Sequence, residues 1–243
     1  MASYTPTVSL DDPITSTGGN GHIPPHHHDG DDSGPSFFDV RLRRARLGLV
    51  VGLTGIVMIF ISFSSAYVVR QGLPTLDPRT DILFHDWFPV PLPRLLLINT
   101  AVLLISSLTM EIARRQAARK AALAQLTSVP GVSMHAKEEV SWLALTVVLG
   151  LSFLTGQWMA WREMAASGFY VASSPSSSFV YLLTGVHGVH LFGGVVALLT
   201  AGAASLLHRP ADSLAIAVDV TGWYWHFMAF LWVYILCLLE FVH

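Results

Sequence analysis

Charged residues are scarce in this sequence. Of its 243 residues, 14 are Lys or Arg and 16 are Asp or Glu, so only 12% carry a formal charge. A soluble domain uses about 25% charged residues, and this chain therefore lacks the polar surface that such a domain needs. The net charge of −2 also provides no basic face for phosphates, so nucleic-acid binding is excluded.

Cysteine is nearly absent, and so is any alternating apolar pattern. The single Cys237 lies inside an apolar run and has no partner for an internal disulfide, which excludes a secreted fold held together by disulfides. The apolar residues form solid runs rather than alternating ten-residue segments, so a transmembrane β-barrel is excluded as well. A helical membrane domain remains.

Long uncharged runs are abundant instead. Five stretches contain no Asp, Glu, Lys or Arg: 47–69, 95–110, 140–161, 164–208 and 220–239. Because about 20 apolar residues cross a bilayer as a helix, the predicted fold class is an all-α membrane protein, a bundle of five transmembrane helices. We place the spans at about 47–69, 92–112, 140–161, 176–207 and 220–242. Residues 111–126 should extend the second helix beyond the bilayer.

The first 40 residues differ from the rest. Residues 1–40 are rich in Gly, Pro, Ser, Thr and Asp and contain His26-His27-His28. This composition predicts a disordered polar tail. The histidine run could chelate a metal, but such tracts are weak signals, and we favour a solvated tail. Residues 41–243 form the predicted membrane domain.

Lys and Arg predict the orientation, because basic residues collect on the cytoplasmic side of a membrane. A cytoplasmic N-terminus and a periplasmic C-terminus place ten of them inside: Arg41, Arg43, Arg44, Arg46, Arg114, Arg115, Arg119, Lys120, Lys137 and Arg209. Four fall outside: Arg70, Arg79, Arg94 and Arg162. The difference favours this orientation over its inverse.

Polar side chains inside a membrane span are costly and are functional candidates. The spans contain five of them: Asn99, Gln157, His187, His190 and His226. His187 and His190 are three residues apart and share one helix face. Three interpretations stay open: ligands of haem iron or copper, parts of a proton path, and hydrogen-bonded contacts between helices or with lipid headgroups. We favour the last.

Other features of the sequence indicate that this chain has few groups for proton transfer or cofactor binding. No Asp or Glu lies inside the five uncharged runs, whereas a proton-coupled carrier normally relays protons through buried carboxylates. His190 and His226 are poorly matched in depth for two axial ligands of one haem. The loops contain no nucleotide-binding motif and no Cys-x-x-Cys-His haem attachment.

Aromatic and small residues mark the expected contact surfaces. Trp223 lies near a span end, where an indole ring prefers the headgroup zone, and we count it with Trp225 among the lipid or inter-helix contacts. Four glycines of the fourth span should let a neighbouring helix approach closely: Gly185, Gly188, Gly193 and Gly194. The first span carries a similar set, which should pack within the chain and against other subunits: Gly48, Gly52 and Gly55.

Two motifs and several shorter segments carry a family resemblance. Trp223-Tyr224-Trp225-His226-Phe227, continuing to Trp232, and Thr184-Gly185-Val186-His187-Gly188-Val189-His190 resemble the WYWHF…W and TGFHGLH helices of haem-copper oxidase subunit III, the cytochrome c oxidase subunit III family. The shorter matches are Gly168-Phe169-Tyr170 to Phe179, Leu149-Gly150 to Gln157, Leu97-Ile98-Asn99-Thr100 and Ser65-Ala66-Tyr67 to Arg70. Each match is weak alone, but together they follow the family's order across residues 46–243.

The resemblance implies the short five-helix bacterial type of subunit III, an accessory core subunit of a proton-pumping terminal oxidase of aerobic respiration in the inner (plasma) membrane. Such a subunit binds phospholipid and stabilises the catalytic subunit I, its direct partner. Subunit II and a small subunit IV are further expected partners. Haem and copper are expected on subunits I and II. This chain should hold no cofactor, no metal and no catalytic residue.

Three positions depart from the family. Its membrane-buried carboxylates correspond here to Ile56, Ala160 and Ala229, so the proton-handling role ascribed to those carboxylates does not transfer to this chain. Asp219, four residues before Trp223, matches an acidic position of the family.

Several alternatives stay open. Within the family, the electron donor is cytochrome c or a quinol, and a nitric-oxide-reductase-linked complex is a further option. Outside the family, the rivals are a stand-alone membrane haem cytochrome that uses the three histidines and a small-solute carrier. Neighbouring genes for subunits I and II would favour the oxidase.

Overall fold

The computed structural model describes residues 37–76, 83–84, 87, 92–126, 142–207 and 211–241. Five α-helices account for most of them: α1 (Phe37–Gly72), α2 (Leu95–Leu126), α3 (Trp142–Ala166), α4 (Pro175–Leu206) and α5 (Ala211–Phe241). Each helix is long and apolar enough to cross a membrane. The prediction of an all-α fold with five membrane-crossing helices is therefore confirmed.

Most of the helices extend beyond the predicted spans. α1 begins at Phe37, ahead of both the predicted span at 47 and the predicted domain boundary at 41. α2 continues to Leu126, as predicted, and α5 begins at Ala211, ahead of position 220. A charged residue ends an apolar run but does not end a helix, whose backbone hydrogen bonds also form outside the bilayer. The predicted tail up to residue 36 lies outside the described residues.

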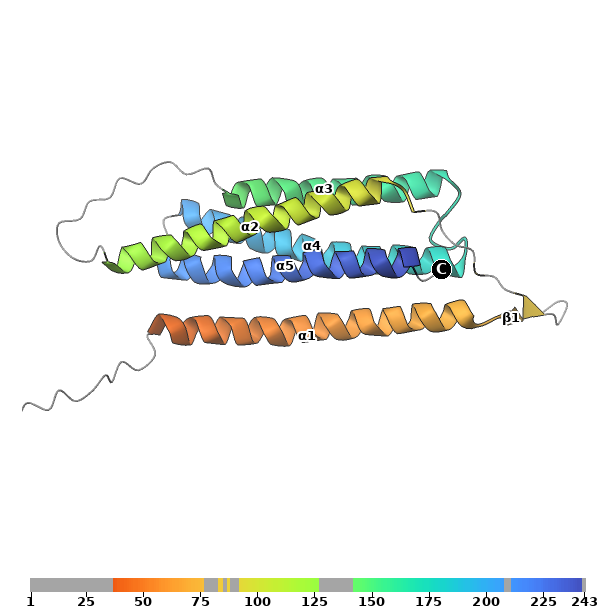
Figure 1. Cartoon of the computed structure of the whole chain (residues 1–243), viewed down its shortest axis with the longest axis horizontal. Helices are drawn as coiled ribbons and strands as arrows, with labels where there is room; N and C mark the ends of the chain where they lie inside the picture. The colour runs from red at the N-terminus through yellow and green to blue at the C-terminus, as the bar shows by residue number, and fades with distance from the viewer. Residues whose placement is uncertain are drawn as a thin grey trace, which may run out of the picture. The chain divides into compact units, whose positions relative to one another are not determined.

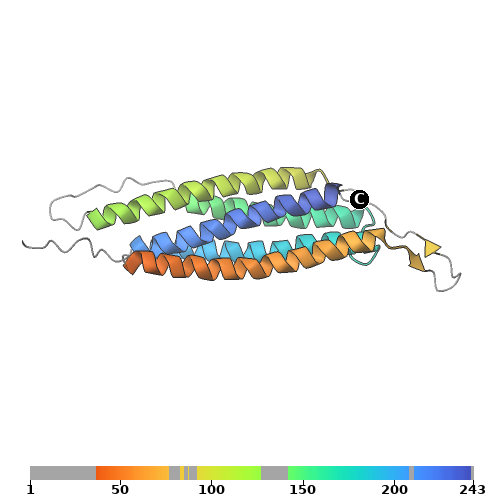
Figure 2. The ribbon, with the colours of Figure 1, turned by 60° about the horizontal axis from the view of Figure 1, so that its bottom comes forward.

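Consecutive helices run in opposite directions (Figure 1). α2 packs on α3 and α5, and α4 packs on the same two helices, so these four helices form a ring of contacts. Among the described helices, α1 packs on α4 and α5 alone, and two views show it along one side of the other four (Figures 1 and 2). In the most apolar window of α1 only 11% of the residues are buried, against 39% in α5.

Aromatic side chains fill the space between the helices. Trp225 and Trp232 of α5 are fully buried, and Trp232 meets Phe153 of α3 edge to face at 5.0 Å. Glycines make room for Trp225: a Cβ added at Gly150 would lie 2.7 Å from its Cη2, and one added at Gly194 would lie 3.2 Å from its Cε3. α3 and α4 therefore approach this ring because they carry no side chain there.

Two of the connections between helices have defined structure. Between α1 and α2, β1 (Thr75–Leu76) pairs with β2 (Leu83–Phe84) in an antiparallel hairpin that the sequence did not predict. After α3, Gly168 has a φ of +89°, in the left-handed region where glycine ends helices without steric cost. The chain then enters α4 at Pro175, a residue type that suits the first turn of a helix.

Candidate functional site

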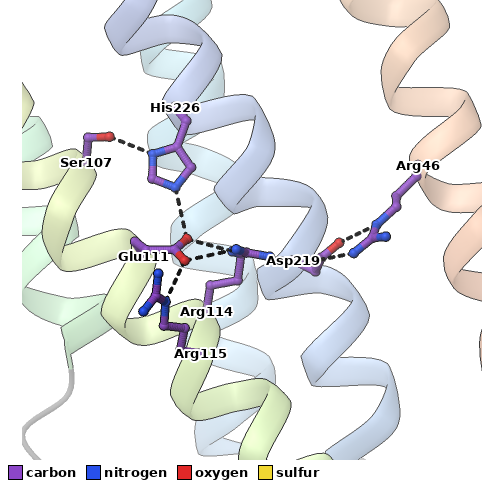
Figure 3. Close-up of polar contacts among 7 residues, drawn as sticks. All are labelled: Arg46, Ser107, Glu111, Arg114, Arg115, Asp219 and His226. Carbon is purple, nitrogen blue, oxygen red and sulfur yellow. Dashed lines mark hydrogen bonds and ion pairs between the residues drawn. The ribbon is translucent and has the colours of Figure 1, made fainter.

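A cluster of charged side chains joins α1, α2 and α5 (Figure 3). Asp219 of α5 lies at its centre. Its Oδ2 accepts a hydrogen bond from Nε of Arg46 at 2.9 Å, and its Oδ1 accepts from Nη2 of Arg46 and Nη1 of Arg114, each at 3.1 Å. Because Arg46 belongs to α1 and Arg114 to α2, one carboxylate with 13% of its surface exposed links three helices.

Glu111 completes the charged cluster from α2. Its carboxylate accepts from Nε and Nη2 of Arg114 at 2.8 and 3.0 Å, and from Nε of Arg115 at 2.7 Å. The sequence spacing explains this geometry, because residues three and four apart lie on the same side of a helix. A two-pronged arginine–carboxylate contact fixes the plane of the guanidinium. Glu111 therefore holds Arg114 in position for Asp219.

His226 continues the charged cluster along α5. Its Nδ1 lies 2.6 Å from Oγ of Ser107, and its Nε2 lies 3.4 Å from Oε2 of Glu111 (Figure 3). A neutral ring with its proton on Nε2 satisfies both contacts, because the Ser107 hydroxyl then donates to Nδ1 while Nε2–H faces the carboxylate. The imidazole thus joins α5 to α2 through both of its nitrogens.

Arg114 is also enclosed by apolar neighbours. Its Cζ lies 5.8 Å from the ring centroid of Trp223, which is a cation–π distance. A Cβ added at Gly222 would lie 3.0 Å from Cδ of Arg114, so this glycine leaves space for the arginine stem. All four oxygens of Asp219 and Glu111 contact protein nitrogens. The arrangement is therefore suited to holding helices together.

Buried polar residues form a second group between α2, α3 and α4. Nδ2 of Asn99 donates to the carbonyl oxygen of Phe153 at 3.0 Å. A Cβ added at Gly156 would lie 2.4 Å from Oδ1 of Asn99, so α2 and α3 touch closely here. His187 of α4 is fully buried and faces the rings of Phe153 and Trp232, with centroid distances of 6.1 and 5.1 Å.

Three atoms of this second group have no hydrogen-bond partner among the described residues. They are both ring nitrogens of His187 and Oε1 of Gln157, a side chain that is itself 3% exposed. An unpaired buried polar atom costs about 1–3 kcal/mol, and proteins normally satisfy such atoms with ordered water. We expect water molecules to bind to the ring nitrogens of His187 and to Oε1 of Gln157.

His190 and His226 contact different helices. Nδ1 of His190 lies 2.7 Å from the carbonyl oxygen of Val186, and its ring meets Phe60 of α1 edge-on at 6.1 Å. The carbonyl oxygen of His190 accepts a hydrogen bond from the Tyr224 hydroxyl at 2.8 Å. Since His226 contacts α2, the structure does not join the two residues into one pair of ligands. In the described ranges, no three His, Cys, Asp or Glu side chains lie together as a potential metal site.

The two predicted tryptophan contacts lie in different surroundings. Trp225 is fully buried, and its Nε1 donates to Oγ of Ser106 on α2 at 3.2 Å. Trp223 is 52% exposed and touches the cluster through Arg114. The first is an inter-helix contact, whereas the second lies at the outer surface of α5.

The four glycines singled out on α4 divide into two pairs. A Cβ on Gly194 would lie 3.0 Å from Cε1 of Tyr224, and a Cβ on Gly185 would meet Trp161 at an ordinary 3.8 Å. A Cβ on Gly188 or Gly193 would meet no atom of the described part of the chain within 4 Å. Close packing at these last two positions would therefore involve another chain.

Sequence reasoning missed most of the charged cluster. Glu111 and Asp219 lie next to uncharged runs rather than inside them, and although Asp219 matches an acidic position of the family, its arginine partners were not predicted. The structure places both carboxylates within candidate membrane-spanning helices, Leu95–Leu123 and Ser213–Phe241, which extend beyond the uncharged runs. The spacing of Glu111, Arg114 and Arg115 could have revealed half of the cluster. No sequence signal connects Arg46 with Asp219, which are 173 residues apart.

The described residues define an integral membrane protein of five helices in which charged and buried polar side chains connect neighbouring helices. A family profile for cytochrome c oxidase subunit III matches residues 36–242, which include all five helices. The chain belongs to the cytochrome c oxidase subunit III family. The predicted family is therefore confirmed.

Individual relatives agree with the family. The chain is 27% identical over 198 residues to the probable cytochrome c oxidase subunit 3 of Mycobacterium leprae (strain TN), a match that covers 81% of this chain and 87% of the relative. It is 28% identical over 195 residues to cytochrome c oxidase subunit 3 of Danio rerio, covering 78% of this chain and 66% of that protein. The chain thus spans most of the bacterial relative and just under two thirds of the fish relative.

Proposed function

We propose that this chain is the accessory subunit III of a proton-pumping terminal haem-copper oxidase in aerobic respiration. In this role it binds lipid and stabilises the catalytic subunit I. The observation that carries the proposal is the family match over residues 36–242. The membrane is proposed to be a bacterial plasma membrane, in agreement with the mycobacterial relatives.

The proposed partners follow from the family. Subunit I is the direct partner, with subunit II and a small subunit IV as further members, and haem and copper are assigned to subunits I and II. The protein contacts of two histidines support a packing role between helices, since His226 contacts Ser107 and Glu111 of α2 while the His190 ring meets Phe60 of α1. The proposed electron donor is cytochrome c, and a quinol is the alternative.

The outer surface of α1 supports a membrane partner. Leu47, Val51 and Met58 are each more than 60% exposed on this helix. At Gly48, Gly52 and Gly55, no atom of the described residues lies within 4 Å of an added Cβ. An apolar helix surface with so little cover meets lipid tails or the helices of another subunit, and small residues favour close helix contact.

Proton transfer through the family's membrane carboxylates is not part of the proposal. Ala160 and Ala229 occupy two of the corresponding positions and are almost fully buried. Ile56 occupies the third and packs against the apolar core. None of these side chains can bind or release a proton. The proposed support of subunit I therefore does not depend on proton transfer at these three positions.

Purification of the tagged chain in mild detergent tests the proposal. We expect subunit I to copurify in equal amount, visible as its haem absorbance, whereas a tagged five-helix membrane protein of another family should bring none. The chain expressed alone should show no Soret band and no stoichiometric copper. Haem on the isolated chain that disappears in His226→Gln would overturn the accessory role in favour of a cytochrome.

A further inference from the structure

An open groove of about 740 Å³ lies where α3 ends and α4 begins. It is separate from the charged cluster and contains none of the candidate polar residues discussed above. Its lining is mainly aromatic and aliphatic. The residues that matter for its chemistry are Trp158, Trp161, Arg162, Tyr170, Tyr181 and Leu182.

Hydrogen bonds within the protein hold two of the aromatic walls in place. Nε1 of Trp161 donates to Oγ1 of Thr184 at 3.1 Å, which ties α3 to α4. The Tyr181 hydroxyl lies 3.2 Å from the carbonyl oxygen of Trp161 and 3.0 Å from that of Phe169. Because these polar groups are already engaged, the two rings present apolar surface to the groove.

Three donor groups at the groove are not engaged. No acceptor among the described residues contacts the guanidinium of Arg162, the indole N–H of Trp158 or the hydroxyl of Tyr170. All three residues are exposed, with Trp158 at 61% and Tyr170 at 62%. Among the described residues that line the groove there is no Asp or Glu. The groove therefore offers one positive charge and three free donors, and this pattern is complementary to the oxygens of a phosphate.

The positions of these groups along α3 fit the depth of a lipid. Arg162 directly follows the uncharged run that ends at residue 161, so it lies at the boundary of the apolar layer. Trp158 is four residues deeper, about 6 Å along the helix axis. Trp and Tyr rings favour this interfacial depth. A headgroup at Arg162 and Tyr170 would therefore place acyl carbons against Trp158, Trp161 and Leu182.

We propose that this groove binds an anionic glycerophospholipid, with the phosphate on Arg162 and Tyr170 and the upper part of one acyl chain along Trp158. The inference deepens the proposed lipid-binding role and rests on it. A volume of about 740 Å³ accommodates a headgroup and the first acyl carbons, which is the scale of ordinary ligand pockets. A partner helix suits the groove less well, because it would have to supply acceptors to Arg162 and Tyr170 at the boundary and also to Trp158 about 6 Å deeper.

Photo-crosslinking in the intact complex tests this site. The complex is placed in nanodiscs that contain phosphatidylglycerol with a diazirine near the glycerol end of one acyl chain, or the matching phosphatidylcholine. We expect several-fold more adducts from phosphatidylglycerol on the peptides that cover residues 158–182. Arg162→Gln should reduce this labelling to the phosphatidylcholine level, and Arg162→Lys should retain most of it.

Arg94→Gln is the matched control, since Arg94 is exposed at the same end of the helices and does not line the groove. It should leave the labelling unchanged. If Arg162→Gln disturbs assembly, Tyr170→Phe replaces it and should lower the preference for phosphatidylglycerol by removing one donor. Equal labelling by the two lipids, or groove peptides that are labelled only after subunit I is removed, would overturn the inference. Loss of copurification with subunit I in the wild type would instead contradict the proposed function.

Discussion

Asp219 accepts hydrogen bonds from two arginines on two different helices. Replacing Asp219 should therefore cost more stability than replacing Arg46. Replacing Arg46 leaves Asp219 with Arg114, and Arg114 still has Glu111. Replacing Asp219 leaves Arg46 without either of its two hydrogen bonds to the carboxylate and leaves Arg114 with a single carboxylate. Hydrogen bonds to charged groups contribute about 1.5–3 kcal/mol, whereas exposed ion pairs contribute about 0.2–1 kcal/mol.

Asp219→Asn should therefore lower the stability of the α1 contact more than Arg46→Gln does. We expect a loss of about 1–3 kcal/mol for the first and below about 1 kcal/mol for the second, because the Arg46 side chain is 47% exposed. Thermal unfolding of the purified complex measures both changes, and Arg44→Gln, on the same exposed stretch of α1, serves as the control. Equal effects of the two variants would show that Asp219 does not bridge the helices.

Substitution of His226 separates a packing role from a metal-binding role. Gln at this position keeps a hydrogen-bonding group for Ser107 and Glu111, so His226→Gln should assemble with a loss of about 0.6–2 kcal/mol, as for other membrane hydrogen bonds. His226→Leu should be worse, because Ser107 loses its partner in an apolar environment. The yield and thermal stability of the complex report this order. A Leu variant as stable as the Gln variant would contradict the hydrogen-bonding role.

At the scale of helices, the ranges of the five elements followed from the sequence because each needs a long uncharged run. The first residues of α1 and α5 did not follow, because both helices begin ahead of the uncharged runs, where apolar content no longer marks them. The β1–β2 hairpin also escaped prediction, since each strand has only two residues and such short strands leave no periodicity in a sequence.

The sequence indicated which polar residues would make contacts between helices, but it did not indicate which partner each of them would contact. Asn99 was recognised as a buried polar residue, yet nothing in the sequence indicates that it bonds the Phe153 carbonyl. The glycines illustrate the same limit. Four glycines on α4 look alike in sequence, but only the structure shows that Gly194 faces Trp225 while Gly188 has no neighbour. Which glycine faces a neighbouring helix depends on how α4 is rotated about its axis, and the local sequence does not determine that rotation.

Two glycine-to-alanine changes test the close approach of the helices. In Gly150→Ala the new Cβ would lie 2.7 Å from the rigid Trp225 ring, so α3 must shift, at a cost of about 1–3 kcal/mol. Gly188→Ala meets no atom within 4 Å and gains helix propensity, so the isolated chain should be unchanged or slightly more stable. Thermal unfolding of the isolated chain compares them. A stable Gly150→Ala protein would contradict the packing around Trp225.

For the whole molecule, the orientation in the membrane remains a prediction. Ten basic residues lie on one side and four on the other when the N-terminus is cytoplasmic. Reporter fusions after Glu138 should therefore signal cytoplasm, and fusions after His243 should signal periplasm. A cytoplasmic signal at both positions would require an even number of crossings and would conflict with five spanning helices.

The proposed role of this chain is to sustain an oxidase whose redox centres lie on other subunits. Its most direct test is oxygen consumption over many turnovers by the complex purified with and without the chain. We predict that the complex lacking the chain begins at a substantial fraction of the normal rate and then loses activity much faster, and that adding back the chain restores its lifetime. Unchanged rate and unchanged lifetime without the chain would contradict the account.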